Sequence, residues 1–462
     1  MSVDLIINNV KIVSPRATIP GSVAVKDGKI VEIVQDESLL PEAAETIDAN
    51  GKYLMPGAID LHVHFRDPGL TYKEDFTTGS QAAAAGGVTT VYDMPNVEPI
   101  MITVDAFNKK LAIAKEKSFV NFAFYTYLAQ GMEENTRELI DAGIGAIKWD
   151  MDSGRIEYPT GYGTLENYEL ADNGDVMRIM RIAAEHDLVV GVHAEDMELV
   201  RELRADLKAA GRTDFRAHLD SRPDFVEVAG MDRAMRLAEI TDCRLHIHHL
   251  SSKAGLELLK ERRFKGLDIT CEAGPAWMFF SADDYERMGG LIRVTPAVKE
   301  KYDSDALWQG LVDGSVDCYA TDHAPHSREE KLERNWYDCL PGAIGVETSI
   351  PLLLDKVNKG EISIERVVEV ACENPALINN IFPRKGVISV GADADLVLLD
   401  MDREWTIKSE EMHSKTGITA FDGWKVKGMP AMVWVNGHLV SKERQIVGKP
   451  GIGKLINPKK DW

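Results

Sequence analysis

The sequence predicts an α/β fold: a (β/α)8 TIM barrel joined to a small β-sandwich that is formed from both chain termini. Three observations favour this fold. Eight short apolar segments recur through the middle of the chain, helical segments separate most of them, and β-branched runs occupy both ends. Because 462 residues exceed one ordinary core, we expect a sandwich part at 1–54, a barrel at 55–384, and the rest of the sandwich with a tail at 385–462.

The two ends of the chain share a pattern of short strands. Residues 5–7 and 11–13 are β-branched runs, and Asn8-Asn9 between them indicates a turn. Near the C-terminus, residues 431–435 form a similar run that turns at Asn436-Gly437. Neither end is long enough for a robust core, so we expect the two to form one sandwich together.

The middle of the chain alternates strands with helices. The expected strands are 58–64, 87–93, 119–127, 144–149, 188–193, 243–249, 267–272 and 316–321. The expected helices are 76–85, 106–117, 137–142, 175–185, 224–239, 254–260 and 304–311. A doubly wound open sheet is the alternative, and it is disfavoured because no glycine-rich phosphate loop follows the first strand.

Composition excludes several classes of protein. The formal charge of −21 argues against a nucleic-acid or anionic-membrane surface. We see no apolar run of membrane-spanning length and no signal peptide. The five dispersed cysteines lack CxxC spacing, which is typical of reduced thiols in a cytoplasmic protein. Metal ligands are therefore expected among histidines and carboxylates.

Catalytic residues of a TIM barrel lie at the C-terminal ends of its strands, and the candidate functional residues of this chain follow the same rule. His62 and His64 end the first strand on one face, because residues i and i+2 of a strand share a face. Further candidates end the fourth, fifth, sixth and eighth strands: Lys148, His193, the group His246, His248 and His249, and Asp322. Four imidazoles and a carboxylate suit Zn²⁺ or a similar metal.

Lys148 is the unusual member of this group, because a protonated lysine would repel a cation. It fits if its pKa is depressed, or if CO₂ converts it to a carbamate that bridges two metal ions. Two divalent metal ions can hold a bridging hydroxide and polarise a carbonyl. Asp322 can then move a proton to the leaving nitrogen. This set of groups predicts hydrolysis of an amide or ester.

The chain resembles the cyclic amidohydrolases of the amidohydrolase superfamily: dihydroorotases, allantoinases and hydantoinases. The resemblance covers nearly the whole chain and rests on these motifs: MPGAIDLHVHFRDPG (55–69), GGVTTVYDMPN (86–96), GAIKWD (145–150), VHAED (192–196), HHLSS (248–252), TDHAPH (321–326), ENPA (373–376) and GADADLVLLD (391–400). It implies that His62, His64 and Asp322 bind the more buried metal. It also implies that His193 and His249 bind the other, with carboxylated Lys148 as the bridge.

The resemblance also suggests a substrate. Arg66 and Asn96 resemble the pair by which dihydroorotases hold the substrate carboxylate, and His326 would be a further contact. Dihydroorotase, an activity of pyrimidine biosynthesis, is therefore the leading hypothesis. Allantoinase or another hydantoin-like ring hydrolase is the alternative, and a catalytically silent structural relative is a third. A homodimer or homotetramer is implied as well.

Six positions depart from the patterns of these enzymes. Two of them, Ala276 and Trp277, stand where relatives carry one or two histidines or His-Tyr. Lys148 replaces the aspartate of many bacterial dihydroorotases, and Thr295 and Lys299 stand where dihydroorotases usually place asparagine and arginine. Ser153 replaces the tyrosine that hydantoinases use. The glycine- and tyrosine-rich stretch 150–168 differs from all three patterns, and we expect it to form a lid over the site.

Overall fold

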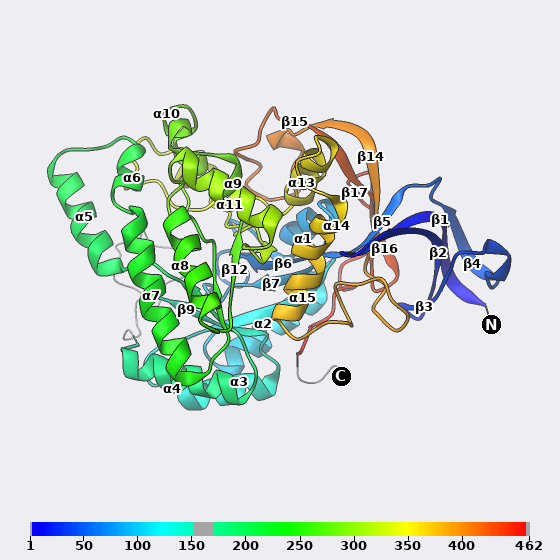
Figure 1. The fold of residues 1–462 in the computed structure, drawn as a ribbon, viewed down its shortest axis with the longest axis horizontal. Helices are drawn as coiled ribbons and strands as arrows, with labels where there is room; N and C mark the ends of the chain where they lie inside the picture. Colours follow the sequence, from blue (N-terminus) through cyan, green and yellow to red (C-terminus); the bar gives the residue numbers. More distant parts are fainter. Residues whose placement is uncertain (1, 152–170, 459–462) are drawn as a thin grey trace.

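Eight parallel strands follow one another in chain order around the centre of the computed structural model, which describes residues 2–151 and 171–458 (Figure 1). They are β6 (Ala58–Val63), β7 (Val88–Asp93), β8 (Asn121–Tyr127), β9 (Ala146–Asp150), β10 (Val190–His193), β11 (Leu245–Ile247), β12 (Ile269–Ala273) and β13 (Cys318–Tyr319). The ring closes just beyond β13, where the His64 N–H donates to the His323 carbonyl at 2.8 Å and Val63 pairs with His323. The predicted barrel is confirmed.

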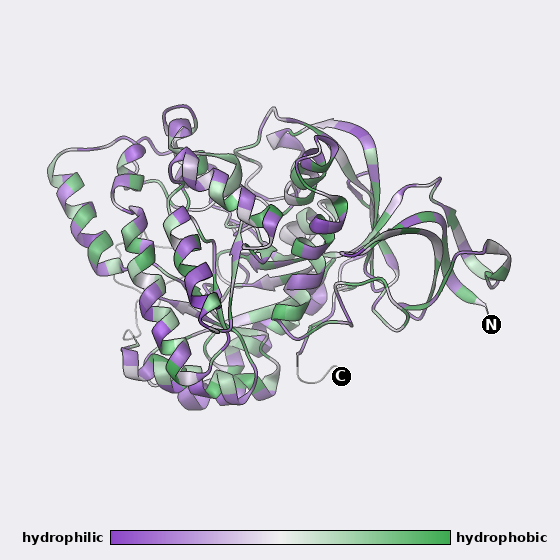
Figure 2. Ribbon diagram, in the orientation of Figure 1, coloured by the Kyte–Doolittle hydropathy of each residue, from purple (hydrophilic) through white to green (hydrophobic). Residues whose placement is uncertain are grey.

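Helices surround this barrel (Figure 1). They are α1 (Phe76–Ala85), α2 (Val104–Lys117), α3 (Glu133–Ala142), α4 (Asn173–Glu185), α5 (Met197–Ala209), α6 (Arg216–Asp220), α7 (Asp224–Thr241), α8 (Lys253–Phe264), α9 (Pro275–Phe279), α10 (Tyr285–Met288), α11 (Lys301–Asp313), α12 (Arg328–Lys331), α13 (Ser349–Asn358), α14 (Ile364–Val368) and α15 (Asn374–Ile378). Hydrophilic and hydrophobic residues alternate along the outer helices (Figure 2). Among the described residues, no helix is long and apolar enough to cross a membrane.

All seven expected helices are present, and α1 has the expected bounds. The N-terminus of α1 is capped by Asp75, whose side chain accepts a hydrogen bond from the Thr78 N–H at 2.9 Å. Two longer helices, α5 and α13, were not expected from the sequence. The first seven residues of α13 are all buried, from Ser349 to Asp355, so this helix has little of the alternation that marks a surface helix.

Both chain termini build a second sheet, as predicted. Its strands are β1 (Val3–Val13), β2 (Thr18–Lys26), β3 (Lys29–Val34), β4 (Ala43–Asp48), β5 (Tyr53–Pro56), β14 (Leu396–Thr406), β15 (Lys425–Val435), β16 (His438–Lys442) and β17 (Gln445–Ile446). The halves meet where β5 and β14 pair antiparallel, with Leu54 opposite Leu398. In Figure 1 this blue and orange sheet lies beside the barrel.

Strand β14 connects the two hydrophobic cores. Leu396 and Leu398 pack in the core of the small sheet, whereas Val397 and Leu399 belong to the large cluster around the barrel. This alternation follows the two-residue period of a strand, whose successive side chains point to opposite faces. The small sheet therefore shares a strand with the packing of the barrel.

The expectation of a turn at Asn8-Asn9 is wrong. Residues 3–13 form the single strand β1, and the register of its pairing with β2 shifts between Ile7 and Val10. Asn9 adopts a left-handed conformation with φ of 53°. Asparagine tolerates this region better than most residues, so the pair marks a bulge within one strand. The turn at Asn436-Gly437 is confirmed between β15 and β16.

A buried ion cluster lies where the barrel and the small sheet meet. The Lys385 ammonium, 1% exposed, contacts Asp393 at 2.9 Å and also pairs with Asp395. Asp395 accepts hydrogen bonds from the Asn121 amide at 3.0 Å and from the Asn436 N–H at 2.7 Å. These contacts connect strand β8 of the barrel to the turn that follows β15.

We expect Lys385→Met to lower the free energy of unfolding by about 3–5 kcal/mol at pH 7, because it leaves the buried Asp395 carboxylate without its Lys385 partner. Burial raises the pKa of Asp393, but the Lys385 and Lys29 cations outweigh burial and hold that pKa below its ordinary value of 3.8. Carboxylates with a lowered pKa stabilise the fold above their unfolded pKa. The difference between the two proteins should therefore narrow below about pH 4.

Urea unfolding at several pH values measures this difference. Lys109→Met is the matched control, because Lys109 pairs with Asp105 in an exposed contact. It should change stability by less than about 1 kcal/mol. Equal effects of the two substitutions would contradict the proposed importance of the buried cluster.

Candidate metal centre and active site

The first and eighth strand ends bring three side chains together. His62 and His64 leave β6 on one face, and their Nε2 atoms lie 3.3 Å and 3.1 Å from Asp322 Oδ1. One ligand atom from each of the three residues lies within 4.8 Å of the others. The hydrogen bonds between residues 62–64 and His323 fix this approach. The spacing is suitable for three ligands of one metal ion.

Buried acceptors orient these two imidazoles. His62 Nδ1 lies 2.5 Å from Glu272 Oε1, and His64 Nδ1 lies 2.6 Å from Asn96 Oδ1. Because a carboxylate only accepts hydrogen bonds, Nδ1 of His62 carries the proton and its Nε2 presents a lone pair to Asp322. The amide oxygen assigned to Asn96 gives His64 the same tautomer.

Burial favours the neutral form of both imidazoles. Burial lowers the pKa of His62, although the charges of Glu272 and Asp322 oppose that effect. Burial and the Arg66 charge hold the pKa of His64 well below its ordinary value. Two imidazole nitrogens therefore converge on one carboxylate oxygen. This set of donor atoms fits a divalent metal ion.

A second pair of imidazoles lies at the ends of β10 and β11. His193 Nδ1 is 3.0 Å from His249 Nε2, and His193 Nε2 is 2.8 Å from Glu195 Oε2. The Glu195 carboxylate places the proton of His193 on Nε2, so Nδ1 has the lone pair. Burial holds the pKa of His249 well below its ordinary value. Two nitrogen ligands of one metal ion lie roughly 3.3 Å apart in tetrahedral geometry, close to the observed spacing.

Backbone conformation explains why His249 is the member of the strand-six group that meets His193. Strand β11 ends at Ile247, and His249 has a left-handed φ of 35°. Strand parity therefore no longer decides where its side chain points. His246 and His248 instead contact Glu272, at 3.2 Å and 3.0 Å. Both histidines also belong to groups that could hold a metal ion, His248 with His62 and Glu272, and His246 with Glu272 and Cys318. Their exclusion as ligands, which the family resemblance implies, stays a prediction.

Three residues of the site share this left-handed conformation. Besides His249, Asp322 has φ of 48° and Arg66 has φ of 59°. Each costs of order 1–3 kcal/mol in a residue other than glycine, and such strain gathers at functional sites. All three follow the end of a barrel strand, where the strained turn directs the side chain toward the cavity.

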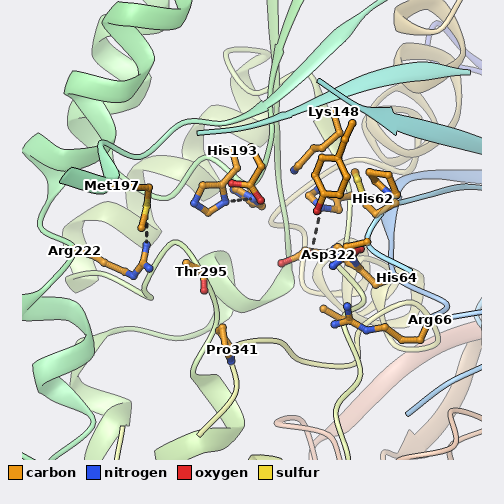
Figure 3. A pocket seen from close by; sticks show the side chains of 17 residues that line it. His62, His64, Arg66, Lys148, His193, Met197, Arg222, Thr295, Asp322 and Pro341 are labelled. Carbon is orange, nitrogen blue, oxygen red and sulfur yellow. Dashed lines mark hydrogen bonds and ion pairs between the residues drawn. The ribbon is translucent and has the colours of Figure 1, made fainter. Parts of the chain in front are cut away.

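Lys148 lies between the two groups of imidazoles (Figure 3). It belongs to β9, is buried, and its charge acts on His62, His249 and Asp322. Burial lowers the pKa of Lys148, although the Asp150 and Asp322 charges raise it. At a given pH, a larger fraction of this lysine is therefore in the neutral amine form that reacts with CO₂ than of a surface lysine. A carbamate at this position would supply oxygen ligands on either side.

All six predicted ligands line one cavity, together with Arg66 and Asn96 (Figure 3). Arg66 is buried and its Nε donates to the Pro325 carbonyl at 3.3 Å. Asn96 contributes to the wall and also contacts His64. His326 lies behind Arg66, with its Nε2 3.3 Å from Arg66 Nη2 and 2.9 Å from the Pro341 carbonyl. A substrate would meet Arg66 before His326.

Comparison with known proteins agrees with this geometry. A family model described as "Amidohydrolase family" matches residues 53–440. The chain belongs to the amidohydrolase family. Its match spans the whole barrel and, in the small sheet, strands β5, β14 and β15.

Relatives of this amidohydrolase have three different names. The structure titled L-hydantoinase (dihydropyrimidinase) from Arthrobacter aurescens is 35% identical, with a TM-score of 0.94 over 98% of this chain and 100% of that one. An allantoinase of Deinococcus radiodurans is 31% identical over 99% of this chain and 100% of its own length. A dihydroorotase of Halobacterium salinarum is 38% identical over 85% of this chain and 88% of its own. This amidohydrolase thus belongs to the cyclic amidohydrolase group.

Sequence reasoning missed the carboxylates that orient the imidazoles. Glu272 contacts His62, His246 and His248, and also accepts the His249 N–H at 3.2 Å. Glu195 follows His193 by two residues, the same spacing as His62 and His64, so this signal was present in the sequence. Glu272 gives no such local signal, because its partners lie on other strands.

The positions that depart from the family patterns have varied surroundings. Thr295 lines the cavity. Lys299 is buried and donates to the Arg222 carbonyl at 2.7 Å. Trp277 lies against His249, with ring centroids 5.7 Å apart, and its indole N–H donates to the Pro296 carbonyl at 2.9 Å. Ser153 and most of the expected lid at 150–168 lie outside the described residues.

We expect His249→Asn to remove at least one metal equivalent per chain, because His249 Nε2 faces His193 Nδ1. Substitution of one ligand leaves too few strong donors at that position. Metal analysis of purified and Zn²⁺-reconstituted protein provides the measurement. His246→Gln is the strand-six control, since His246 contacts Thr270 and Glu272, and it should keep the wild-type metal content. The reverse pattern would move the ligand assignment to His246.

Proposed function

We propose that this amidohydrolase is a binuclear metal-dependent hydrolase of a ring amide, with dihydroorotate as the leading substrate. The observation that carries the reaction type is the convergence of His62, His64 and Asp322 with His193 and His249 around Lys148 in one cavity. Zn²⁺ is the proposed metal, and the same ligands also suit Mn²⁺ or Co²⁺. The complete ligand set argues against a catalytically silent relative.

In this proposal each side chain has a defined task. When bound, two divalent metal ions activate water at neutral pH and polarise the carbonyl of the ring amide. Asp322 takes the proton from the attacking water and delivers it to the ring nitrogen as the carbon–nitrogen bond breaks. Burial raises the pKa of Asp322, although His62 and Lys148 oppose that effect. A carbamate on Lys148 would supply oxygen ligands to the metal centre.

The choice of dihydroorotate rests on Arg66. Its buried guanidinium lines the cavity beside His64, and its planar fork suits a substrate carboxylate. Asn96 is the proposed second contact, and His326 acts by holding Arg66. This arrangement favours a ring that has an acidic substituent.

A hydantoin-like ring is the second candidate. Thr295 lines the cavity where dihydroorotases usually place asparagine, and a protein titled L-hydantoinase aligns with this chain along its full length. The same metal chemistry would open a hydantoin or allantoin ring. The two candidate activities therefore require the same metal ligands at the strand ends and differ in the side chains, such as Arg66 and Thr295, that would contact the substrate.

A substrate comparison tests both candidates. Metal-loaded protein is assayed with dihydroorotate, allantoin and 5-substituted hydantoins, and we expect turnover of dihydroorotate. Arg66→Met should lower kcat/KM for it by about 10- to 150-fold, the value of a hydrogen bond to a charged group, and leave metal content unchanged. Turnover of allantoin or hydantoins alone would overturn the assignment of dihydroorotate as the substrate and support the proposed reaction type. No turnover of any ring amide by fully loaded protein would overturn both.

We expect bicarbonate to accelerate reconstitution of the metal-free protein. The lowered pKa of Lys148 leaves more neutral amine at a given pH, and only this form reacts with CO₂. Apoprotein is reconstituted with Zn²⁺ in CO₂-depleted buffer, with and without added bicarbonate, and the recovery of bound metal is followed. Lys148→Arg is the control and should bind less metal with no response to bicarbonate. Equal recovery in both buffers would contradict the carbamate.

A further inference from the structure

We propose that Arg222 and Glu195 form a positioning pair for the metal ligand His193, so that the two arginines of the cavity have different tasks. Arg66 meets the substrate, whereas Arg222 acts through Glu195 on the metal centre. This inference rests on the metal binding of the proposed function and does not depend on which ring is the substrate.

Glu195 is placed to set the orientation of His193. It lies two residues beyond His193, is 0% exposed, and its Oε2 is 2.8 Å from His193 Nε2. A carboxylate accepts and cannot donate, so this contact holds the proton on Nε2. His193 Nδ1 is then free of a proton where it faces His249 Nε2 at 3.0 Å. Without an acceptor at Glu195, the ring can rotate or change tautomer and Nδ1 no longer points steadily toward that position.

Arg222 holds Glu195 from the other side. Its Nη1 donates to the same Oε2 atom that accepts from His193. The side chain is 1% exposed and its main-chain carbonyl accepts from Lys299 Nζ at 2.7 Å, so both ends of the residue are fixed. Arg222 precedes Pro223, the residue before helix α7, and this position brings it to the cavity wall.

The charge of Arg222 thus has a buried carboxylate partner. Such a pairing weakens the attraction of a buried arginine for a substrate anion. Arg66 donates to the Pro325 carbonyl and contacts the ring of His326. In Figure 3, Arg222 lies beside Met197 and Thr295, while Arg66 lies near His64.

Each group of metal ligands has its own orienting carboxylate. Glu272 contacts His62 in one group, and Glu195 contacts His193 in the other. Glu195 therefore supports one metal position, while the hydrogen bonds of His62 and His64 are independent of it. Removal of Glu195 should therefore lower the binding affinity for one of the two metal ions and leave the other unchanged.

Metal content of the resting protein tests this proposal. Glu195→Met keeps the length of the side chain and removes the acceptor. It should lower the affinity for one Zn²⁺ by about 10- to 100-fold. Dialysis against a series of Zn²⁺ concentrations, followed by metal analysis, should then show one tight and one weakened equivalent. Glu195→Gln keeps an acceptor oxygen and should restore most of the affinity. Two unchanged equivalents in Glu195→Met would overturn the proposal.

Arg222→Met tests the second half of the pair. It should weaken the same Zn²⁺, and at saturating Zn²⁺ it should change KM by less than threefold, because the substrate is held elsewhere. A large rise in KM with unchanged Zn²⁺ affinity would overturn the proposal and make Arg222 a substrate anchor. Lys385→Met is the matched control: it also removes a buried paired cation, and it should keep both Zn²⁺ affinities.

Two further outcomes are separable. If Glu195→Met does not fold, as judged by circular dichroism, Glu195→Gln and Arg222→Met decide by their Zn²⁺ affinities, and wild-type values in both would overturn the pair. If the wild-type protein binds no Zn²⁺, the proposed function fails at its first step. Because metal is counted without substrate, a wrong ring in the substrate comparison leaves the inference intact.

Discussion

The convergence of buried imidazoles from separate strand ends is the constraint on which this molecule depends. Nε2 of His62 and His64 both approach Asp322 Oδ1, and Nδ1 of His193 approaches Nε2 of His249. Buried acceptors at the other ring nitrogen hold His62, His64 and His193 in these orientations. Three features direct side chains into this cavity: the closure of the barrel, the strained turns after its strands, and the buried Lys148.

Much of this could be predicted from the sequence because the relevant signals are local. Largely apolar runs of six to nine residues marked the eight barrel strands, and the HxH spacing placed His62 and His64 on one face. What could not be predicted depends on contacts between distant segments. Glu272 reaches His62 across 210 positions of the chain, and His249 turns inward through a backbone angle that strand parity does not contain. Helix α13 escaped notice because it is buried too completely to alternate.

The cavity has a floor and a wall with different tasks. The floor consists of strand ends that carry the predicted metal ligands, and the closed barrel holds these ends in fixed register. The wall includes Arg66, Thr295 and Arg222, which follow strands or lie in connecting segments. Substitutions in such segments disturb the core less than substitutions in strands. Relatives named for different ring substrates can thus share one fold along its full length.

The pairing of β5 with β14 has a consequence for how the chain is made. Strand β5 ends at Pro56 and its partner begins at Leu396, so one edge of the N-terminal strands has no neighbour until the barrel and β14 have been synthesised. An open edge is a template for pairing with other chains. During translation the nascent N-terminal strands must therefore remain shielded while the whole barrel emerges. Strand β14 then covers this edge and joins the core of the small sheet to that of the barrel.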